Sequence, residues 1–436
     1  MKRRAIDRLV NWMGNTTKKP LFIFGARRVG KTYLVKDFAK QYFKDVMYVN
    51  CESNVFANDV FNENVTFEMI LRKLELIFNK SVNKVDTLLV FDEIEKNEKA
   101  LRAVLDIVKL PVEYNIICTI SCNSDYGMKE YNLPTKDLEI MSLYPLSFEE
   151  FLINTGHEDM VDKIYDCYKN NSSLPGLMHK QAFDLYYDYL SLGGMPEVIK
   201  EYIESGAVIN AIDYHKTIIE SYKSDMLRNK GAVFCKKIIA TYSSIPSQLY
   251  KKNKKFKYKL VEEGGSSNHL AASIDWLVNN DIAYKCNKVE SFDTPEITTN
   301  ENSFILYLND VGLLTNLAEF PIYFIRNRDA VNEKMFDMLS ENYVACALKS
   351  NSIDLIFWKN NYDSNLDFVI KSKTGLIIPV EVKSNNSIKS RSLSNFMNEY
   401  QPKYGIRFST KNFSFKNNIK NIPLYAAFCI NKRNLD

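Results

Sequence analysis

The chain has 436 residues, of which 46% are hydrophobic and 25% charged, a composition ordinary for a globular protein of roughly two to four domains. Its 57 Lys and Arg residues against 53 Asp and Glu residues leave a net charge of +4, which excludes a strong overall field toward nucleic acid or a membrane surface. Any nucleic-acid contact must therefore come from a local patch.

The sequence gives little support for a disulfide framework, a zinc site or a membrane segment. The eight cysteines form no CxxC pair and the four histidines are far apart, which favours free thiols in a reducing compartment. Residues 1–4 are basic, but residues 5–13 are amphipathic rather than an apolar signal core, and no run approaches the ~18 apolar residues of a membrane span. We therefore expect a cytoplasmic protein with no membrane partner.

The first motif follows the apolar run Leu21–Phe24. It reads Gly25-Ala26-Arg27-Arg28-Val29-Gly30-Lys31-Thr32 and fits G-x-x-x-x-G-K-[ST], the Walker A pattern, before a helix-forming segment. The glycines let backbone N–H groups approach phosphate oxygens at the positive end of that helix. Lys31 is expected to reach the β- and γ-phosphates and the Thr32 hydroxyl to bind Mg²⁺. The loop thus predicts a site for ATP and Mg²⁺.

Arg27 and Arg28 lie inside this loop, where they could contact either phosphate or a neighbouring acid.

A second motif ends the apolar stretch Thr87–Phe91. A continuous apolar run indicates a strand that is buried on both faces. Asp92 and Glu93 follow this run directly, so the predicted strand ends in two carboxylates. In a P-loop ATPase, an acid at this position holds Mg²⁺, and the acid beside it orients and deprotonates the attacking water. We assign Asp92 to the metal and Glu93 to the general base, with Lys31 as the remaining catalytic residue.

Strand and helix signals alternate through residue 155. We expect strands at 20–25, 45–50, 87–91 and 115–121 and one beginning at 139, with helices at 1–19, 33–40, 67–78 and 98–109. Ser121 and Asn123 follow the fourth strand, where either could sense the γ-phosphate, and Ser147 with Glu150 reads as a helix capping box. Residues 1–155 are therefore predicted to form a three-layer α/β P-loop NTPase domain with its ligand at the carboxyl ends of a parallel sheet.

Residues 156–230 carry helical patterning with few strand signals. Two glycines and a proline at Gly193–Glu197 predict a turn between helices. The segment resembles the small helical lid of AAA-type ATPases, in which an arginine often contacts nucleotide. Arg228 is the candidate for that contact.

Residues 231–320 are interpreted as a winged helix-turn-helix. Three helices are expected, the first at 236–242, the second beginning after Ile245-Pro246-Ser247, and the third at 268–279. Strands at 282–289 and 304–309 would form the wing. Six lysines lie between residues 251 and 259. The third helix carries Asp275 and no Arg or Lys, so we expect non-specific phosphate contact rather than base readout. The alternative is a structural module with a solvated lysine run.

Residues 321–436 form the last predicted domain, with a helix at 333–349 and strands at 353–358, 366–371 and 376–384. Asp367 begins one strand, and Glu381 and Lys383 alternate on one face of the next. An Asp and a Glu can bind a divalent metal, and a nearby Lys can activate water or stabilise a pentavalent phosphate. With Glu341 on the preceding helix, the four residues are a candidate nuclease site; the alternative is a structural polar cluster.

Six segments share one resemblance. They are the loop Gly25–Thr32, Phe91–Ile94, Pro145–Phe151, Gly193–Pro196, Leu306–Leu314, and Asp367 with Pro379–Lys383. Together they resemble the AAA-like P-loop ATPases of bacteria and archaea, a family of uncharacterised function. The resemblance implies an ATPase core, a helical lid, a winged helix and a C-terminal α/β restriction-endonuclease-like domain of the PD-(D/E)xK type.

The chain departs from that family at two places. Asn365 stands where an acid commonly precedes the family's Leu/Val-Asp, which lowers the expected metal affinity. The sensor region, commonly a Gly-Ser pair, reads Ser121-Cys122 and leaves the sensor unassigned.

The sequence thus predicts an enzyme that hydrolyses ATP to ADP and phosphate at its Walker A and B motifs. Its nucleotide state would reposition C-terminal domains that bind DNA or a protein partner. One alternative is an ATP-regulated, metal-dependent DNA nuclease, and another is a slow nucleotide-dependent switch that binds a protein partner. The effector, the oligomeric state and any arginine finger are left open.

Overall fold

The computed structural model describes residues 1–52, 60–61, 66–108, 114–229, 231–292, 297–321, 325, 333–360, 364–385, 391–432 and 434–435. The chain divides into two compact units. The first consists of residues 2–144 with 279–281, and the second of residue 1 with 145–278 and 282–436. The predicted ATPase motifs all lie in the first unit.

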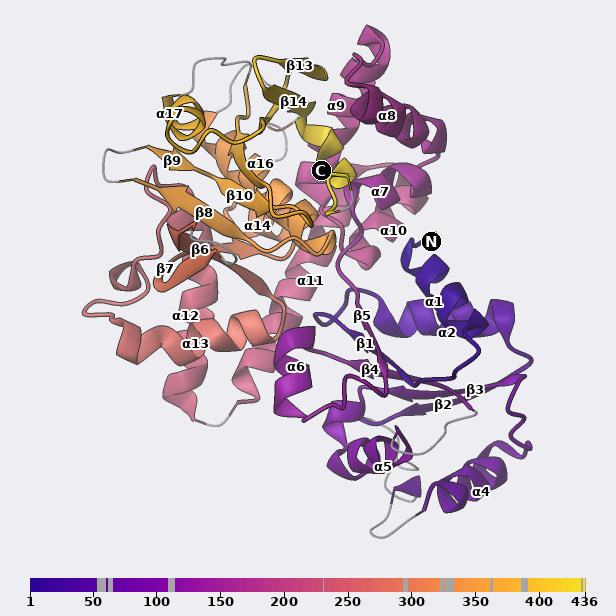
Figure 1. The fold of residues 1–436 in the computed structure, drawn as a ribbon. Coiled ribbons are helices and arrows are strands. Elements are labelled where there is room, and N and C mark those ends of the chain that lie inside the picture. The colour runs from indigo at the N-terminus through magenta and orange to yellow at the C-terminus, as the bar shows by residue number, and fades with distance from the viewer. Residues whose placement is uncertain are drawn as a thin grey trace. The chain divides into compact units, whose positions relative to one another are not determined.

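The first unit is built on a five-stranded parallel sheet (Figure 1). Its strands are β1 (Leu21–Phe24), β2 (Asp45–Asn50), β3 (Thr87–Asp92), β4 (Asn115–Ile120) and β5 (Glu139–Ser142), in the order β2-β3-β4-β1-β5. Every residue of β1, β3 and β4 is buried, as expected for parallel strands covered on both faces. The predicted parallel sheet is confirmed.

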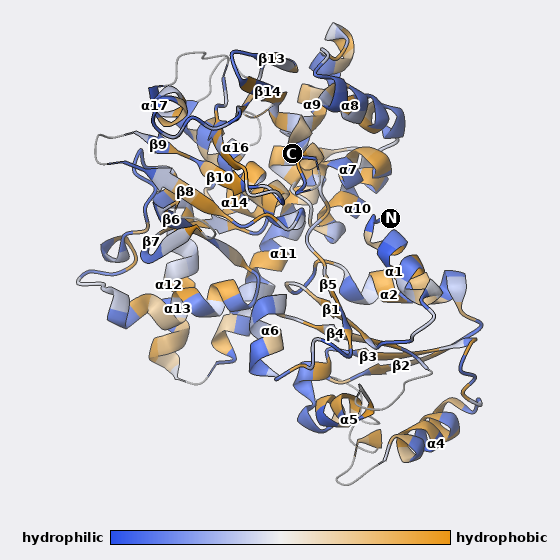
Figure 2. Ribbon diagram, viewed as in Figure 1, coloured by the Kyte–Doolittle hydropathy of each residue, from blue (hydrophilic) through white to orange (hydrophobic). Residues whose placement is uncertain are grey.

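Helices cover both faces of this sheet, which gives the predicted three layers. On one face α1 (Ala5–Gly14) and α2 (Lys31–Tyr42) bury Trp12 and Phe38 against Ile23. On the other face α4 (Phe67–Phe78) and α5 (Glu98–Val108) pack through Leu74 and Val104. The short helices η1 (Ile94–Lys96) and α6 (Ser124–Glu130) follow β3 and β4. Figure 2 shows hydrophobic residues along the strands and both hydrophobic and hydrophilic residues on α4 and α5, as expected for amphipathic helices that cover a sheet.

The second unit begins with helices. They are α7 (Phe148–Asn154), α8 (Glu158–Asn170), α9 (Gly176–Leu192), α10 (Pro196–Ser205), α11 (Val208–Leu227), α12 (Ala232–Leu249), η2 (Tyr258–Leu260), α13 (Ser267–Asn279) and α14 (Val311–Leu317). The capping box of α7 forms as predicted, because Ser147 Oγ accepts from Glu150 N and Glu150 Oε2 accepts from Ser147 N. The predicted turn after Leu192 also forms, since α10 starts at Pro196.

The prediction of two separate helices around Ile245-Pro246-Ser247 is wrong, because α12 continues through Pro246. Ile238, Tyr242, Ile245 and Leu249 are all buried and recur at helical spacing on both sides of the proline. The burial of this stripe outweighs the hydrogen bond that a proline removes.

Two glycine segments distant in the chain interlock in this unit. Asp310 caps α14 by accepting from Leu313 N at 2.9 Å, and its other oxygen accepts from Gly194 N at 2.6 Å. A Cβ on Gly194 would lie 2.0 Å from Leu146 O, and one on Gly312 would lie 2.4 Å from Leu192 O. Glycine is therefore required sterically at both positions.

Two sheets complete the second unit. One has the order β7-β6-β8-β9 and the other the order β10-β11-β12-β14-β13. The strands are β6 (Ala283–Ser291), β7 (Thr298–Leu308), β8 (Ile356–Lys359), β9 (Asn365–Leu366), β10 (Phe368–Lys371), β11 (Ile377–Val382), β12 (Gly405–Ser409), β13 (Ser414–Lys416) and β14 (Ile419–Pro423). Helices α16 (Glu333–Ser350), α17 (Arg391–Tyr400) and η4 (Leu424–Cys429) accompany them.

The parallel pairing of β6 with β8 joins strands from either side of residue 320, where a domain boundary was expected. The division of residues 145–436 into lid, winged helix and nuclease-like parts stays a prediction. Among the described residues, no helix is both long and apolar enough to cross a membrane.

Candidate active site

The loop between β1 and α2 depends on two glycines. Gly25 has φ 150° and Gly30 has φ 96°, and Gly30 stands immediately before α2. A Cβ on Gly25 would lie 2.1 Å from Leu143 O, so a side chain there would push the loop out of place. The loop brings its backbone to the N-terminus of a helix, where an anion is stabilised.

Lys31 is buried in this loop, with only 5% of its surface exposed. Its Nζ donates to Gly25 O at 2.9 Å, to Ala26 O at 3.0 Å and to Ser121 Oγ at 2.8 Å. Burial lowers the pKa of the ammonium, and the nearby carboxylates act in the opposite direction. The cation is thus held inside the loop by acceptors.

Asp92 lies at the end of β3 and gathers three hydroxyl groups. Its carboxylate accepts from Thr32 Oγ1 at 2.8 Å, from Tyr48 OH at 2.5 Å and from Thr119 Oγ1 at 2.6 Å. Burial and the bond to Asp92 raise the pKa of Tyr48, which keeps that phenol protonated as a donor. Thr32 and Asp92 offer hard oxygen ligands side by side, a set that fits Mg²⁺.

Glu93 and Lys31 are joined through one hydroxyl. Ser121 Oγ donates to Glu93 Oε1 at 2.7 Å and accepts from Lys31 Nζ. Because β4 lies between β1 and β3, its carboxyl end places Ser121 between the loop and the acids. Asn123 instead caps α6 by accepting from Asp125 N at 2.9 Å.

The two arginines of the loop differ. Arg27 Nη2 lies 2.8 Å from Glu52 Oε1 and 3.6 Å from Glu93 Oε2, so it contacts neighbouring acids, one of the two predicted alternatives. Arg28 is exposed and has a left-handed φ of 66°. Arg228, the candidate in the second unit, forms an ion pair with Asp225 at 3.5 Å.

Glu95 is a residue of this site that the sequence did not single out. Its Oε1 accepts from Ser121 N at 3.1 Å, and its Oε2 accepts no hydrogen bond within the described ranges. Burial raises the pKa of Glu95 to about 7, and the Glu93 carboxylate adds to the shift. The sequence points to Glu95 only as one of the acids within the four residues Asp92–Glu95.

The C-terminal acids lie among residues that the sequence also did not single out. Glu341 Oε1 accepts from Tyr307 OH at 2.5 Å, and Glu341 Oε2 forms an ion pair with Lys254 Nζ. Lys254, one of the six linker lysines, keeps only 20% of its side chain exposed. Asp367 Oδ2 accepts from Val382 N at 2.8 Å.

Glu381 has its own internal cation. Its Oε2 lies 3.0 Å from Arg407 Nε, and its Oε1 lies 3.7 Å from Lys383 Nζ. Arg407 stands opposite Glu381 in the β11–β12 register, and both side chains are nearly inaccessible to water. In the part of the chain that the structure describes, no three His, Cys, Asp or Glu side chains are arranged to hold a metal ion. Glu341 and Glu381 are thus each paired with a cation of the chain itself, and the candidate nuclease site stays a prediction.

Asp367 gives the second unit a predicted pH dependence. Burial raises its pKa to about 8, and Glu341 adds to the shift while Lys254 and Lys383 oppose it. The unfolded pKa is about 3.9. Because the folded pKa is the higher one, the stabilising contribution is complete below about pH 4 and is lost as the pH rises through 8.

Asp367→Asn should therefore flatten the pH dependence and make the protein more stable than wild type at pH 9, by roughly 1–3 kcal/mol. Urea unfolding at pH 5, 7 and 9, followed by tryptophan fluorescence, measures this. Asp275→Asn, a change at an exposed acid on α13, is the control. Equal pH slopes for wild type and Asp367→Asn would contradict the assignment.

The loop and the acid-tipped strand have the geometry by which P-loop proteins hold nucleotide phosphates. Comparison with family models agrees, since residues 17–152 match the model described as an AAA domain. Residues 17–152 therefore have the motif and the fold of an AAA-type P-loop domain. Residues 183–321 and 336–427 match two models described as domains of unknown function, DUF8612 and DUF4143.

A comparison with curated proteins found no match. Among solved structures, the chain is similar to the Aeropyrum pernix ORC1 protein in complex with DNA (11% identity, 73% of this chain and 92% of that one, TM-score 0.32). It is also similar to Cdc6p from Pyrobaculum aerophilum (10%, 75% and 94%, 0.25) and to Drosophila ORC bound to DNA (12%, 73% and 95%, 0.28). These TM-scores all lie below 0.5.

Proposed function

We propose that this protein binds ATP with Mg²⁺ and hydrolyses it to ADP and phosphate, and that its nucleotide state repositions C-terminal parts that bind DNA or a protein. The observation that carries the proposal is the Ser121 hydroxyl, which bridges the Lys31 ammonium and the Glu93 carboxylate. It links the group that would hold the phosphates to the group that would activate water.

The binding roles follow from the contacts. The backbone of Gly25–Thr32 and the Lys31 ammonium would hold the phosphates, and Lys31 would exchange its present carbonyl acceptors for phosphate oxygens. Thr32 and Asp92 would hold Mg²⁺, which neutralises phosphate charge when bound. Tyr48 and Thr119 orient the Asp92 carboxylate.

Glu93 is the proposed general base. Its Oε2 accepts no hydrogen bond within the described ranges and lies 3.6 Å from Arg27 Nη2, so this oxygen has a lone pair that can accept a proton from water while the guanidinium stays beside it. Ser121 fixes the other oxygen and is the proposed phosphate sensor, in preference to Asn123.

We favour this function over a metal-dependent nuclease because Glu341 and Glu381 are each paired with an internal cation, Lys254 and Arg407. A slow switch differs from the proposed function only in rate. Tight ATP binding with turnover near zero would replace the proposal by that alternative.

Lys31→Ala should weaken ATP binding by on the order of 100-fold or more, because charge-assisted hydrogen bonds to two phosphates are lost. Isothermal titration with a slowly hydrolysed ATP analogue and Mg²⁺ measures the affinity, and circular dichroism checks the fold. Lys40→Ala removes an exposed lysine of the same helix and should bind as wild type. Wild-type affinity in a folded Lys31→Ala variant would refute the site.

A further inference from the structure

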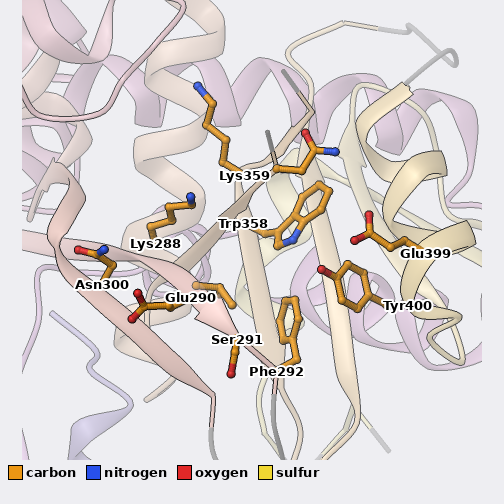
Figure 3. Close-up of a pocket in the computed structure, with 11 residues that line it drawn as sticks. Lys288, Glu290, Ser291, Phe292, Asn300, Trp358, Lys359, Glu399 and Tyr400 are labelled. Atoms are coloured by element: carbon orange, nitrogen blue, oxygen red, sulfur yellow. The ribbon is translucent and has the colours of Figure 1, made fainter. Parts of the chain in front are cut away.

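The second unit contains a pocket of about 590 Å³ that the ATPase motifs do not use (Figure 3). It lies where the ends of β6 and β8 meet the end of α17. Its lining includes Lys288, Phe292, Trp358, Lys359, Glu399 and Tyr400. Its volume falls within the range of about 300–1,000 Å³ that is usual for sites of small organic ligands.

The pocket has an aromatic wall that is fixed in place. The Tyr400 ring lies 4.9 Å from Phe292 and 6.0 Å from Trp358, both edge to face, and Trp358 packs edge to face on Phe396 at 5.1 Å. The Tyr400 ring also packs on Phe396, with 4.5 Å between the ring centroids. Trp358 is 4% exposed whereas Tyr400 is 40% exposed, so Tyr400 offers a preorganised ring to a ligand.

The charges of the pocket are mixed. In Figure 3, Lys288 and Lys359 lie on one side of the Trp358 ring, with Tyr400 and Glu399 on the other. Two ammonium groups suit a phosphate, and carboxylate and amide groups can pair with the polar edge of a base.

A peptide of one charge sign suits this lining less well. A run of like charges along a peptide would meet opposing charges in this lining, the lysines for a basic peptide and Glu290 and Glu399 for an acidic one, whereas a nucleotide carries its charge at one end and can keep it beside the lysines. A nucleotide combines a flat aromatic ring, donors and acceptors on its edge, and one phosphate, which matches all three parts of the pocket.

We propose that this pocket binds a nucleobase together with its phosphate, with the base stacked on Tyr400 and the phosphate at Lys288 and Lys359. The ligand is a free nucleotide or one unit of a single-stranded nucleic acid. The inference deepens the DNA-binding part of the proposed function and is independent of ATP hydrolysis.

The test uses the full chain carrying Lys31→Ala, so that the P-loop does not contribute nucleotide binding. Fluorescence anisotropy measures binding of a fluorescein-labelled 15-nucleotide oligo-dT and of a 15-base-pair duplex, and unlabelled dTMP and dAMP serve as competitors. We expect the single strand to bind more tightly than the duplex. If dTMP or dAMP displaces the labelled strand, a free nucleotide is sufficient for binding to the pocket. If only unlabelled oligo-dT displaces it, the ligand is a single-stranded nucleic acid.

Tyr400→Ala should weaken binding by roughly 5- to 150-fold, because stacking contributes about 1–3 kcal/mol per base. Tyr400→Phe keeps the ring and should bind as wild type, which separates stacking from loss of fold. Lys288→Ala with Lys359→Ala should reduce the slope of log affinity against log salt by about 0.7, the contribution of one neutralised phosphate on a single strand. Tyr42→Ala is the matched control, since Tyr42 is 41% exposed and lies in the other unit.

Three outcomes would overturn the proposal. The first is that the Lys31→Ala protein binds neither oligo-dT nor mononucleotides at any salt concentration tested. Tyr400→Ala and the double lysine variant could instead bind as wild type while remaining folded by circular dichroism. A labelled oligo-lysine or oligo-glutamate peptide that binds in a Tyr400-dependent manner, where oligo-dT does not, would assign the pocket to a peptide.

Discussion

Glu93→Gln should reduce ATP turnover by about 10²–10⁴-fold, the range usual for loss of a general base, while ATP affinity changes only a few-fold. Glutamine has the same size and can still accept the hydrogen bond that Ser121 donates, but it cannot take up the proton of the attacking water. Single-turnover release of phosphate measures the chemical step, and nucleotide titration measures binding. The two together distinguish a lost base from a lost site.

Two neighbouring acids make this test specific. Glu52→Gln removes the other acid that pairs with Arg27 and should keep most of the activity, since Glu52 is exposed and does not contact Ser121 among the described contacts. Glu95→Gln keeps an acceptor for Ser121 N and should impair turnover less than Glu93→Gln. If Glu93→Gln keeps near-normal turnover and Glu95→Gln is inactive, Glu95 and not Glu93 is the general base.

The second large effect is expected on stability, at the pair of Lys254 and Glu341. Lys254→Met should destabilise the protein by about 3–5 kcal/mol, because it leaves the Glu341 carboxylate without its cation in a buried setting. Glu341→Gln should destabilise it less, since the Asp367 carboxyl can then ionise beside Lys254. The Glu341→Gln, Lys254→Met double variant should recover much of that loss, since neither charge remains. Urea unfolding of the four proteins gives the coupling energy.

Two controls accompany this cycle. Lys255→Met changes an exposed lysine of the same segment and should leave stability within about 0.5 kcal/mol of wild type. Addition of Mn²⁺ should not raise the wild-type unfolding midpoint. A Mn²⁺-dependent rise that Glu341→Gln abolishes would mean that these acids bind metal and that the pair with Lys254 is displaced.

Much of the first unit could be predicted because its signals are local. The Gly25–Thr32 loop follows a strand and opens a helix, and residues 67–78 show the helical period of α4, which has the predicted bounds. The run of apolar residues before Asp92 predicts a doubly covered strand without any tertiary information. In the second unit, the capping of α7 by Ser147 is likewise predicted by four adjacent residues.

The partners of these residues could not be predicted, because sheet order brings them together across long stretches of chain. Ser121 reaches Lys31 only because β4 inserts between β1 and β3. Lys254 and Arg407 carry no motif, and their pairing with Glu341 and Glu381 depends on tertiary packing and strand register. A sequence pattern identified the acids of the C-terminal set and could not show that cations already neutralise two of them.

The hydrogen bond from Gly194 N to the Asp310 carboxylate restricts motion within the second unit. It fastens the start of α14 to the turn between α9 and α10, and the missing side chain at Gly312 lets the two backbones touch. Elements that fit this closely have no room to slide past one another. The turn between α9 and α10 and the start of α14 should therefore stay together as one rigid body during any motion within the second unit.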